Sequence, residues 1–335
     1  MTNNIDLKDS GIKLGIIGTN FISDTLVQAA KMTGLCVSAV FSRRFDTGEA
    51  FAKKHGIENV FCDFEEFLKS DIINAVYVAS PNFCHCPQTI AALEHGKHVL
   101  CEKPAASNLA DFEKMRSLAK EKGLVLLEAM RPAFDPALDI VRQQMKKCGK
   151  LRYAHFEYSQ YSSRYDKFKN GEILNAFNPD FSNAAVMDIG VYPLNVCVSL
   201  FGAPDAVISR SVILENGFEG QGNVILSYGD MTAEVTYSKI THAVLPSIIR
   251  GEDGEVHFGN ALSKIDKMSF FSRKNGEEKI DFCAVENNMI YELSAFCDFV
   301  NKKRDNEEYL DCTAKTLAVI DEIRRQNGIV FPDDK

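Results

Sequence analysis

Short apolar runs alternate with helical patterns through the first third of the chain, and this alternation limits the possible folds most strongly. Strands that are apolar throughout are buried on both faces, as in parallel sheets with crossover helices. The pattern therefore predicts an α/β fold with a doubly wound parallel sheet. The expected strands cover 12–17, 36–41, 75–79, 98–101 and 124–127, and the expected helices cover about 20–31, 47–54, 86–94 and 109–121.

The pattern changes after about residue 150. Residues 231–238 alternate apolar and polar positions, and Gly229-Asp230 joins them to the run 223–228, which predicts a hairpin. Asp253-Gly254 separates 247–250 from 255–258 and predicts a second hairpin. These signals indicate a large, mostly antiparallel open sheet with one solvent-facing side.

Two helices are expected to close the chain. Apolar positions 290, 293, 296 and 300 share one face of the first. The second is expected to run from Asp311, as N-cap, to Gly328, as C-cap. A length of 335 residues favours two domains. The change in periodicity places them at 1–131, a Rossmann-type domain, and 132–335, an α+β domain.

Charge and composition exclude several classes of partner. The net charge is −8, so the chain has no general attraction to nucleic acid or to anionic membranes. The first ten residues contain no apolar signal region, and the run 189–204 is too short and too broken to span a bilayer. Ten scattered cysteines are expected to be reduced thiols, which favours the cytoplasm. Cys84-His85-Cys86 lacks a second pair of zinc ligands, so no metal site is expected.

The segment 15–23 follows the first strand and opens a helix. Gly18 and the small Ser23 fit the glycine fingerprint of dinucleotide-binding loops, whereas Asn20 replaces its middle glycine. Asparagine tolerates a left-handed backbone, so the turn can be preserved. The strand–turn–helix context favours an anion site at the helix N-terminus, and a tight turn without a ligand is the alternative.

The second strand ends in Phe41-Ser42-Arg43-Arg44 and carries no carboxylate. An acidic residue at this position normally binds the ribose hydroxyls of NAD. A hydroxyl and a guanidinium instead suit the 2′-phosphate of NADP, so Ser42 and Arg43 favour NADP, with NAD still possible. The alternative is that the arginines are solvated loop residues.

Four motifs in order resemble the Gfo/Idh/MocA family of glucose–fructose oxidoreductase, inositol dehydrogenase and their relatives. They are the loop 15–23, Ala79-Ser-Pro-Asn82 with His85, Cys101-Glu-Lys-Pro104, and Met187-Asp-Ile-Gly-Val-Tyr-Pro193. The resemblance extends to the closing residues 328–332. With the segment 160–165, it is nearest to the dimeric dihydrodiol dehydrogenase branch and its bacterial sugar-oxidoreductase relatives.

The resemblance implies catalytic roles for Lys103, Asp188 and Tyr192. A lysine at the end of a parallel strand can stabilise a developing alkoxide. Tyr192 stands where many relatives have histidine, and its phenol is the candidate proton donor or acceptor. Asp188 lies four residues before it, on the same helix face, and would orient the substrate or Lys103. A helix N-cap is the alternative role for Asp188.

The resemblance also implies cofactor and substrate contacts. Arg164 and Tyr161 lie in a segment used around the substrate. Two departures, the segment 182–185 and Ala133 in place of an expected arginine, indicate a different substrate pocket. The expected cofactor contacts are Gly18, Thr19, Asn20, Phe21, Ile22, Ser42, Arg43, Ser80, Pro81, Asn82, His85, Glu102 and Lys103.

The resemblance thus implies an NAD(P)-dependent oxidoreductase acting on a sugar, polyol or cyclic diol. It would act as a homodimer or homotetramer, with the second domain serving for substrate binding and oligomerisation. A cofactor-sensing regulator and an NAD-assisted glycosidase of the same fold are the alternatives. The regulator would be expected to lack Lys103 or the proton donor, and both residues are present.

Overall fold

The computed structural model describes residues 5–334. The chain divides into two compact units. The first contains the described residues up to Ala129 together with Val285–Leu310, and the second contains Met130–Ala284 and the chain from Asp311 onward. The segment 285–310 therefore belongs to the first unit, although most of the second unit precedes it in the sequence.

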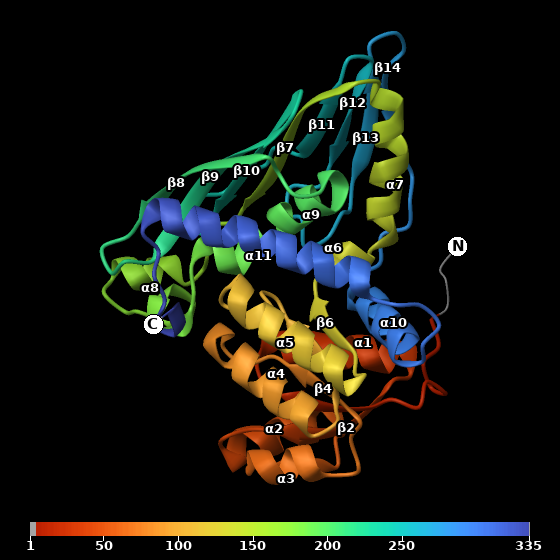
Figure 1. Cartoon of the computed structure of the whole chain (residues 1–335), viewed down its shortest axis with the longest axis vertical. Coiled ribbons are helices and arrows are strands. Elements are labelled where there is room, and N and C mark those ends of the chain that lie inside the picture. The colour runs from red at the N-terminus through yellow and green to blue at the C-terminus, as the bar shows by residue number, and fades with distance from the viewer. Residues whose placement is uncertain (1–4, 335) are drawn as a thin grey trace. The chain divides into compact units, whose positions relative to one another are not determined.

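A six-stranded parallel sheet forms the first unit, which confirms the predicted α/β architecture (Figure 1). Its strand order is β3-β2-β1-β4-β5-β6, so the order reverses between β1 and β4. Ligands of such sheets bind at this reversal, beyond the carboxyl ends of the strands. The strands are β1 (Lys13–Ile17), β2 (Cys36–Phe41), β3 (Asn59–Phe61), β4 (Ala75–Val78), β5 (His98–Glu102) and β6 (Leu126–Ala129).

Helices follow the strands of this sheet as the alternating pattern predicts, and a returning helix joins them. The returning helix packs against the first helix, and Asn287 donates a 2.8 Å hydrogen bond to the Thr25 carbonyl. The helices are α1 (Phe21–Thr33), α2 (Phe45–His55), α3 (Phe64–Lys69), α4 (His85–Glu94), α5 (Leu109–Lys122) and α10 (Met289–Val300), with the 3-10 turn η1 (Asn82–Cys84) before α4.

An eight-stranded sheet dominates the second unit, in the order β14-β13-β12-β11-β7-β10-β9-β8. Only the pair β10–β7 among its described ladders is parallel, so the predicted mostly antiparallel sheet is confirmed. The strands are β7 (Leu151–Ser159), β8 (Ala206–Ile213), β9 (Glu219–Tyr228), β10 (Met231–Ser238), β11 (Ser247–Gly251), β12 (Gly254–Phe258), β13 (Met268–Ser272) and β14 (Gly276–Lys279).

One face of this sheet is covered by helices, and both predicted hairpins lie within it. The buried helix α9 (Val191–Phe201) packs on β7 and β10, and α7 (Pro136–Met145) packs on β12. A π-helical turn, η5 (Val186–Gly190), leads directly into α9. The other helical segments are α6 (Arg131–Phe134), η2 (Lys146–Cys148), α8 (Tyr165–Lys169), η3 (Asn175–Phe177), η4 (Pro179–Phe181), α11 (Glu307–Asn327) and η6 (Pro332–Asp334).

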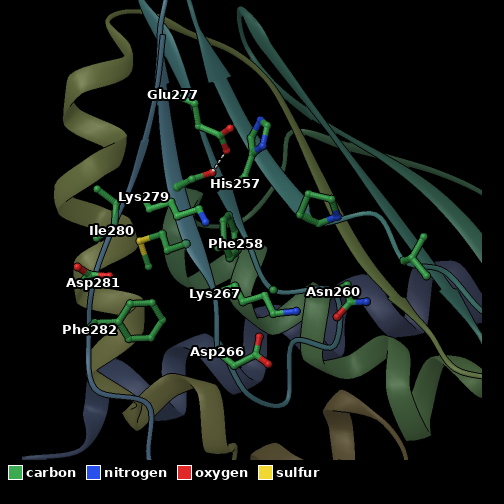
Figure 2. Close-up of a pocket in the computed structure, with 15 residues that line it drawn as sticks. His257, Phe258, Asn260, Asp266, Lys267, Glu277, Lys279, Ile280, Asp281 and Phe282 are labelled. Carbon is green, nitrogen blue, oxygen red and sulfur yellow. Dashed lines mark hydrogen bonds between the residues drawn. The ribbon is translucent and has the colours of Figure 1, made fainter. Parts of the chain in front are cut away.

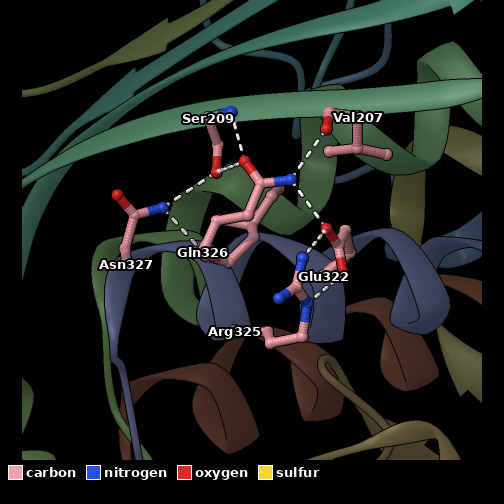
Figure 3. Close-up of polar contacts among 7 residues, drawn as sticks. Val207, Ser209, Glu322, Arg325, Gln326 and Asn327 are labelled. Atoms are coloured by element: carbon pink, nitrogen blue, oxygen red, sulfur yellow. Dashed lines mark hydrogen bonds and ion pairs between the residues drawn. The ribbon is translucent and has the colours of Figure 1, made fainter.

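The long closing helix α11 covers the free edge of β8 with side-chain amides (Figure 3). Gln326 donates to the Val207 carbonyl at 2.7 Å and accepts from the Ser209 amide at 2.8 Å. Asn327 accepts from the Ser211 amide at 2.9 Å. The helix side chains thus satisfy backbone groups of the edge strand that have no neighbouring strand on that side.

The start of α11 differs from the expectation. The helix begins at Glu307, so Asp311 lies inside it and the prediction of an N-cap at Asp311 is wrong. The helix starts earlier because the Asp305 carboxylate accepts a hydrogen bond from the Glu307 amide, so a capping side chain is already present before Asp311. At the other end, Gly328 follows the last helical residue with φ +67°, as a C-terminal glycine should.

Within the described residues, one helical stretch has the length and composition to cross a membrane, Pro179–Phe201. Most of it is interior, since 72% of its most apolar window is buried in the protein. It contains α9, whose residues Val191–Val198 are all buried. The apolar character of this stretch is therefore explained by packing in the core.

Candidate functional site

Gly18 lies in the turn between β1 and α1 and cannot be replaced there without strain. Its φ is +104°, and a Cβ atom would lie 2.5 Å from the carbonyl oxygen of Ala79. The Gly18 amide donates to the Phe41 carbonyl at 3.3 Å. This glycine therefore lets the ends of β1, β2 and β4 approach one another where the strand order reverses.

Asn20 caps helix α1. Its side-chain oxygen accepts from the amides of Ile22 and Ser23 at 3.0 and 3.2 Å, and its side-chain nitrogen donates to the Ala79 carbonyl at 2.7 Å. Its φ is −86°, so Asn20 does not use the left-handed backbone that asparagine tolerates, and the residue of the turn with a positive φ is Gly18. Asparagine is favoured here because its side chain satisfies helix amides.

The residues that flank this turn differ in burial. Thr19 and Ile22 are half-buried, whereas the Phe21 side chain is 68% exposed at the first position of α1. A large exposed aromatic at a helix N-terminus is a surface on which a planar ring can stack. The turn therefore combines a helix N-terminus with an exposed apolar side chain.

The end of β2 carries a hydroxyl pair and two arginines with different surroundings. Ser42 Oγ lies 2.8 Å from Thr47 Oγ1. Arg44 forms an ion pair with Asp46, and this guanidinium lowers the pKa of the Asp46 carboxyl. Arg43 is exposed and forms no ion pair with any residue in the described range 5–334. Of the two arginines, Arg43 is the one available to an external anion.

His85 connects the segments that follow β4 and β5. Its Nε2 lies 2.9 Å from the Ser80 carbonyl oxygen and its Nδ1 lies 2.8 Å from that of Pro104. The side chain is buried, which lowers the pKa of His85, although the two carbonyl contacts act in the opposite direction. Pro81 and Asn82 lie in the same connection and are half-buried. The histidine therefore fixes the Ser80 segment relative to the Lys103 segment.

Lys103 follows directly after β5, at the carboxyl edge of the sheet, and is half-buried. The preceding Glu102 is buried, accepts a hydrogen bond from the Tyr77 hydroxyl and accepts one from the Lys103 amide at 3.2 Å. The Glu102 carboxylate is thus held inside the unit by a neighbouring strand. This arrangement fixes the backbone from which Lys103 projects.

Asp188 and Tyr192 belong to the second unit, where the π-helical turn η5 passes into α9. Asp188 therefore lies inside a helical turn and is no N-cap, so that alternative is wrong. π-Helical turns occur frequently at functional sites. The Asp188 side chain is 39% exposed, whereas Tyr192 is 3% exposed. The carboxylate is accessible to a ligand, and the phenol is held in the protein interior.

A cation from elsewhere in the unit contacts each of these two side chains. The buried Lys239 ammonium lies 2.6 Å from Asp188 Oδ2, donates to the Ala176 carbonyl at 2.7 Å and lies over the rings of Phe177 and Phe218. Arg131 Nη2 donates to the Tyr192 hydroxyl oxygen at 3.1 Å. Sequence reasoning missed both Lys239 and Arg131, because neither belongs to the motifs that carried the resemblance.

The π-helical turn is supported from β9 and β10. Glu219 is fully buried; its carboxylate accepts from the Val186 amide at 2.8 Å and from the Tyr237 hydroxyl at 2.8 Å. Burial raises the pKa of Glu219, and its hydrogen bonds oppose this effect. The Tyr237 ring also fills the space beside Gly190, where a Cβ would lie 2.8 Å from it. These contacts hold the turn that bears Asp188.

The two residues expected around the substrate, Tyr161 and Arg164, lie just before α8. The Tyr161 hydroxyl donates to Asp166 at 2.7 Å, and the Lys169 ammonium lies over its ring. Arg164 is exposed. The aromatic cluster Phe168, Phe177 and Phe218 anchors this segment, and it also contacts Lys239. The segment is therefore connected to Asp188 through Lys239.

A cavity of about 640 Å³ lies elsewhere in the second unit, between β12, β13, β14 and the adjoining loops (Figure 2). Its lining contains none of the site residues expected from the sequence. Lys267 and Lys279 are balanced there by Asp266, Glu277 and Asp281, so it lacks the continuous positive charge of a phosphate site.

Comparison with known proteins places these features in a family. Residues 12–130 match the model of an oxidoreductase family with an NAD-binding Rossmann fold, GFO_IDH_MocA. The chain is 39% identical over 327 residues to the scyllo-inositol 2-dehydrogenase (NADP(+)) IolU of Bacillus subtilis, covering 97% of this chain and 99% of that protein. It is 25% identical to trans-1,2-dihydrobenzene-1,2-diol dehydrogenase of Mus musculus, covering 97% and 98%.

Among solved structures, the chain is similar to KijD10, a 3-ketoreductase from Actinomadura kijaniata in complex with NADP. The TM-score is 0.83 at 23% identity, with 94% of this chain and 98% of that chain covered, so this likeness supports the fold. The near-complete coverage at 39% identity establishes the family. The chain belongs to the Gfo/Idh/MocA family and is an NAD(P)-dependent oxidoreductase.

Proposed function

We propose that the protein oxidises a carbinol of a sugar, polyol or cyclic diol with NADP, or reduces the corresponding ketone. The observation that carries this proposal is the pair on one helical turn: the accessible Asp188 carboxylate and the buried Tyr192 phenol, each contacted by a cation. A carboxylate that accepts from substrate hydroxyls suits a compound with several hydroxyl groups. IolU, the relative at 39% identity, is named for such a substrate and for NADP.

The residues of the first unit fit a nicotinamide dinucleotide. Gly18 keeps the turn free of a Cβ, the N-terminus of α1 favours a pyrophosphate, and Phe21 is exposed beside it. Arg43 and the Ser42–Thr47 hydroxyl pair suit a 2′-phosphate, since the nearby Asp46 is already neutralised by Arg44. Ser80 and Asn82 would hold the nicotinamide end beyond β4, on a segment that the buried His85 fixes in place.

The reaction requires transfer of a hydride and of a proton. A bound nicotinamide would supply the acceptor for the hydride, with its electron pair, that leaves the carbinol carbon. The Tyr192 phenolate would accept the hydroxyl proton as the carbonyl double bond forms, and the resulting phenol would return it during reduction. Lys103 hydrogen-bonds the reacting oxygen and stabilises its negative charge. Asp188 orients the neighbouring hydroxyl groups of the substrate.

The test is a comparison of initial rates with NADP and NAD across cyclitols, aldoses, linear polyols and cyclic diols, with ketones and NADPH in reverse. We expect turnover that is highest with NADP and with a compound carrying adjacent hydroxyls. Tight cofactor binding without turnover of any CH–OH compound would contradict the proposal and would favour a cofactor-sensing regulator.

We further propose that the protein is a cytoplasmic homodimer or homotetramer that associates through the uncovered face of the eight-stranded sheet. On that face, Ile208 and Ile225 lie opposite each other on β8 and β9 and are 62% and 43% exposed. Contiguous exposed apolar side chains mark association surfaces. A monomeric mass by light scattering at micromolar concentration would contradict this, and Ile208→Asp should dissociate the assembly.

A further inference from the structure

We propose that Arg131 is a positioning residue for proton transfer, which acts by directing and stabilising the phenolic oxygen of Tyr192. This inference rests on the proposed function, because it assigns a partner to the group that moves the proton. The observation is the contact between Arg131 Nη2 and the Tyr192 hydroxyl oxygen at 3.1 Å. Both residues belong to the second unit.

The geometry of this contact is restrained on both sides. Arg131 is the first residue of α6, is followed by Pro132, and α6 packs against α9, the helix that carries Tyr192. Proline at this position fixes the backbone of the first turn. The Tyr192 ring is packed against Tyr158, with 5.7 Å between the ring centroids, and is 3% exposed. Neither partner is a freely rotating surface side chain.

The donors and acceptors of the two side chains determine which group donates this hydrogen bond. A guanidinium has only donors and stays protonated at any pH that the protein experiences, so the phenolic oxygen must be the acceptor. The single Tyr192 proton is therefore directed to another acceptor, as a proton donor to substrate requires. When that proton leaves, the negative charge develops beside the Arg131 guanidinium, which is already in place.

Two other polar side chains lie beside the Tyr192 phenol in the second unit. Tyr158 faces it from β7, and its hydroxyl lies 3.3 Å from Ser263. Asp188 precedes it on the same helical turn and is held by Lys239. The Arg131 guanidinium also lies 5.7 Å from the Tyr192 ring centroid, so it faces the ring as well as its oxygen. Arg131 is thus a cation that contacts the oxygen at which the proton moves.

The test is the pH dependence of kcat for alcohol oxidation in Arg131→Met, Arg131→Lys and Tyr192→Phe. Removing an opposite charge at this distance shifts a titration by about 1 to 3 pH units, so Arg131→Met should move the midpoint of the acidic limb upward by that amount. Arg131→Lys should restore part of the shift. Tyr192→Phe should remove the limb, and adding Arg131→Met to it should change little.

Arg142→Met is the matched control, because Arg142 lies in the same unit but pairs with Asp139 and Ser199. It should leave the midpoint unchanged. The inference is overturned if Arg131→Met lowers activity with an unchanged midpoint, or lowers activity equally in the Tyr192→Phe background. Either result would mean that Arg131 acts through general packing or directly on substrate.

A second measurement separates this inference from the proposed reaction. 3-Fluorotyrosine placed at position 192 can be titrated by 19F NMR in the full-length protein without substrate. We expect the midpoint to rise in Arg131→Met and to return partly in Arg131→Lys. This shift supports the Arg131 role even if no CH–OH compound is turned over. Turnover with an unmoved NMR midpoint refutes it while leaving the proposed function intact.

Discussion

The Nζ atom of Lys239 lies 2.6 Å from Oδ2 of Asp188, in an ion pair whose cation is 5% exposed and whose carboxylate is 39% exposed. Because the ammonium is buried and the carboxylate is accessible, the ion pair holds the Asp188 side chain in place while leaving it open to a ligand. The same ammonium donates to the Ala176 carbonyl, so the turn η3 and Asp188 share one partner.

Lys239→Met should lower both stability and activity. It leaves the Ala176 carbonyl without its donor, which costs about 1–3 kcal/mol of unfolding free energy. It also releases Asp188, so KM for a polyhydroxylated substrate should rise more than kcat falls. Urea unfolding and steady-state kinetics measure the two effects. Lys167→Met, which removes an exposed pair with Glu172, is the control and should change neither.

Gly18→Ala should destabilise the first unit and weaken cofactor binding. The left-handed conformation costs about 1–2 kcal/mol for a residue with a Cβ, and the contact with the Ala79 carbonyl adds to this. Gly56→Ala is the control, since Gly56 has φ +73° but nothing within 4 Å of an added Cβ. Equal losses in denaturant unfolding for the two variants would show that the close approach at Gly18 carries no cost.

Arg43→Ala should reduce affinity for NADP and leave affinity for NAD nearly unchanged. Loss of one hydrogen bond to a charged group corresponds to about 1.5–3 kcal/mol, or roughly 10- to 100-fold in Kd. Arg44→Ala should have a smaller effect, because Arg44 is engaged with Asp46. Cofactor titrations at matched ionic strength give the ratio of the Kd values for NADP and NAD. A ratio unchanged by Arg43→Ala would refute the assignment.

Lys103→Met and Tyr192→Phe should each lower kcat by about 10²–10⁴, and Tyr192→Phe should leave cofactor affinity nearly constant. If the two residues act as one unit in proton transfer, the double variant should lose much less than the product of the single losses. Tyr192→Phe should also flatten the pH dependence of oxidation. Full activity in Tyr192→Phe would exclude the phenol as the proton carrier, and multiplicative losses would exclude the coupling.

Glu219→Gln should change how stability depends on pH. Burial raises the pKa of this carboxyl above 4.5, so the native state holds a proton that the unfolded chain releases. The stability that this proton contributes is present below pH 4.5 and is lost as the pH rises through the pKa that Glu219 has in the native state. The difference in unfolding free energy between the glutamine variant and the wild type should therefore favour the variant more near neutral pH than near pH 4.5. An identical difference at both pH values would contradict this.

The parallel sheet could be predicted because its strands are continuous apolar runs, and Ala75–Val78 is buried at every position. β3 and α3 have three and six residues, too short for a periodic signal to emerge. β6 begins two residues later than expected, at Leu126. The return of α10 to the first unit was not predictable from its own pattern, because its packing partner α1 lies at the other end of the chain.

The residues of the candidate site could be predicted where they lie in a sequence motif. They could not be predicted where they reach the site from a distant part of the chain. Lys103, Asp188 and Tyr192 lie in contiguous motifs. Arg131 contacts Tyr192 across 61 positions, and Lys239 reaches Asp188 from the end of another element. An isolated lysine or arginine in a sequence normally denotes solvated surface, and only the fold shows that Lys239 is buried.

The amide side chains of Gln326 and Asn327 also have a consequence for how the protein behaves at high concentration. An open edge strand is a template on which another chain can add a strand, which leads to aggregation. On β8, the backbone groups of Val207 and Ser209 that would accept such a strand are already bonded to α11. Shortening the closing helix should therefore create an aggregation-prone edge in a unit whose sheet is otherwise intact.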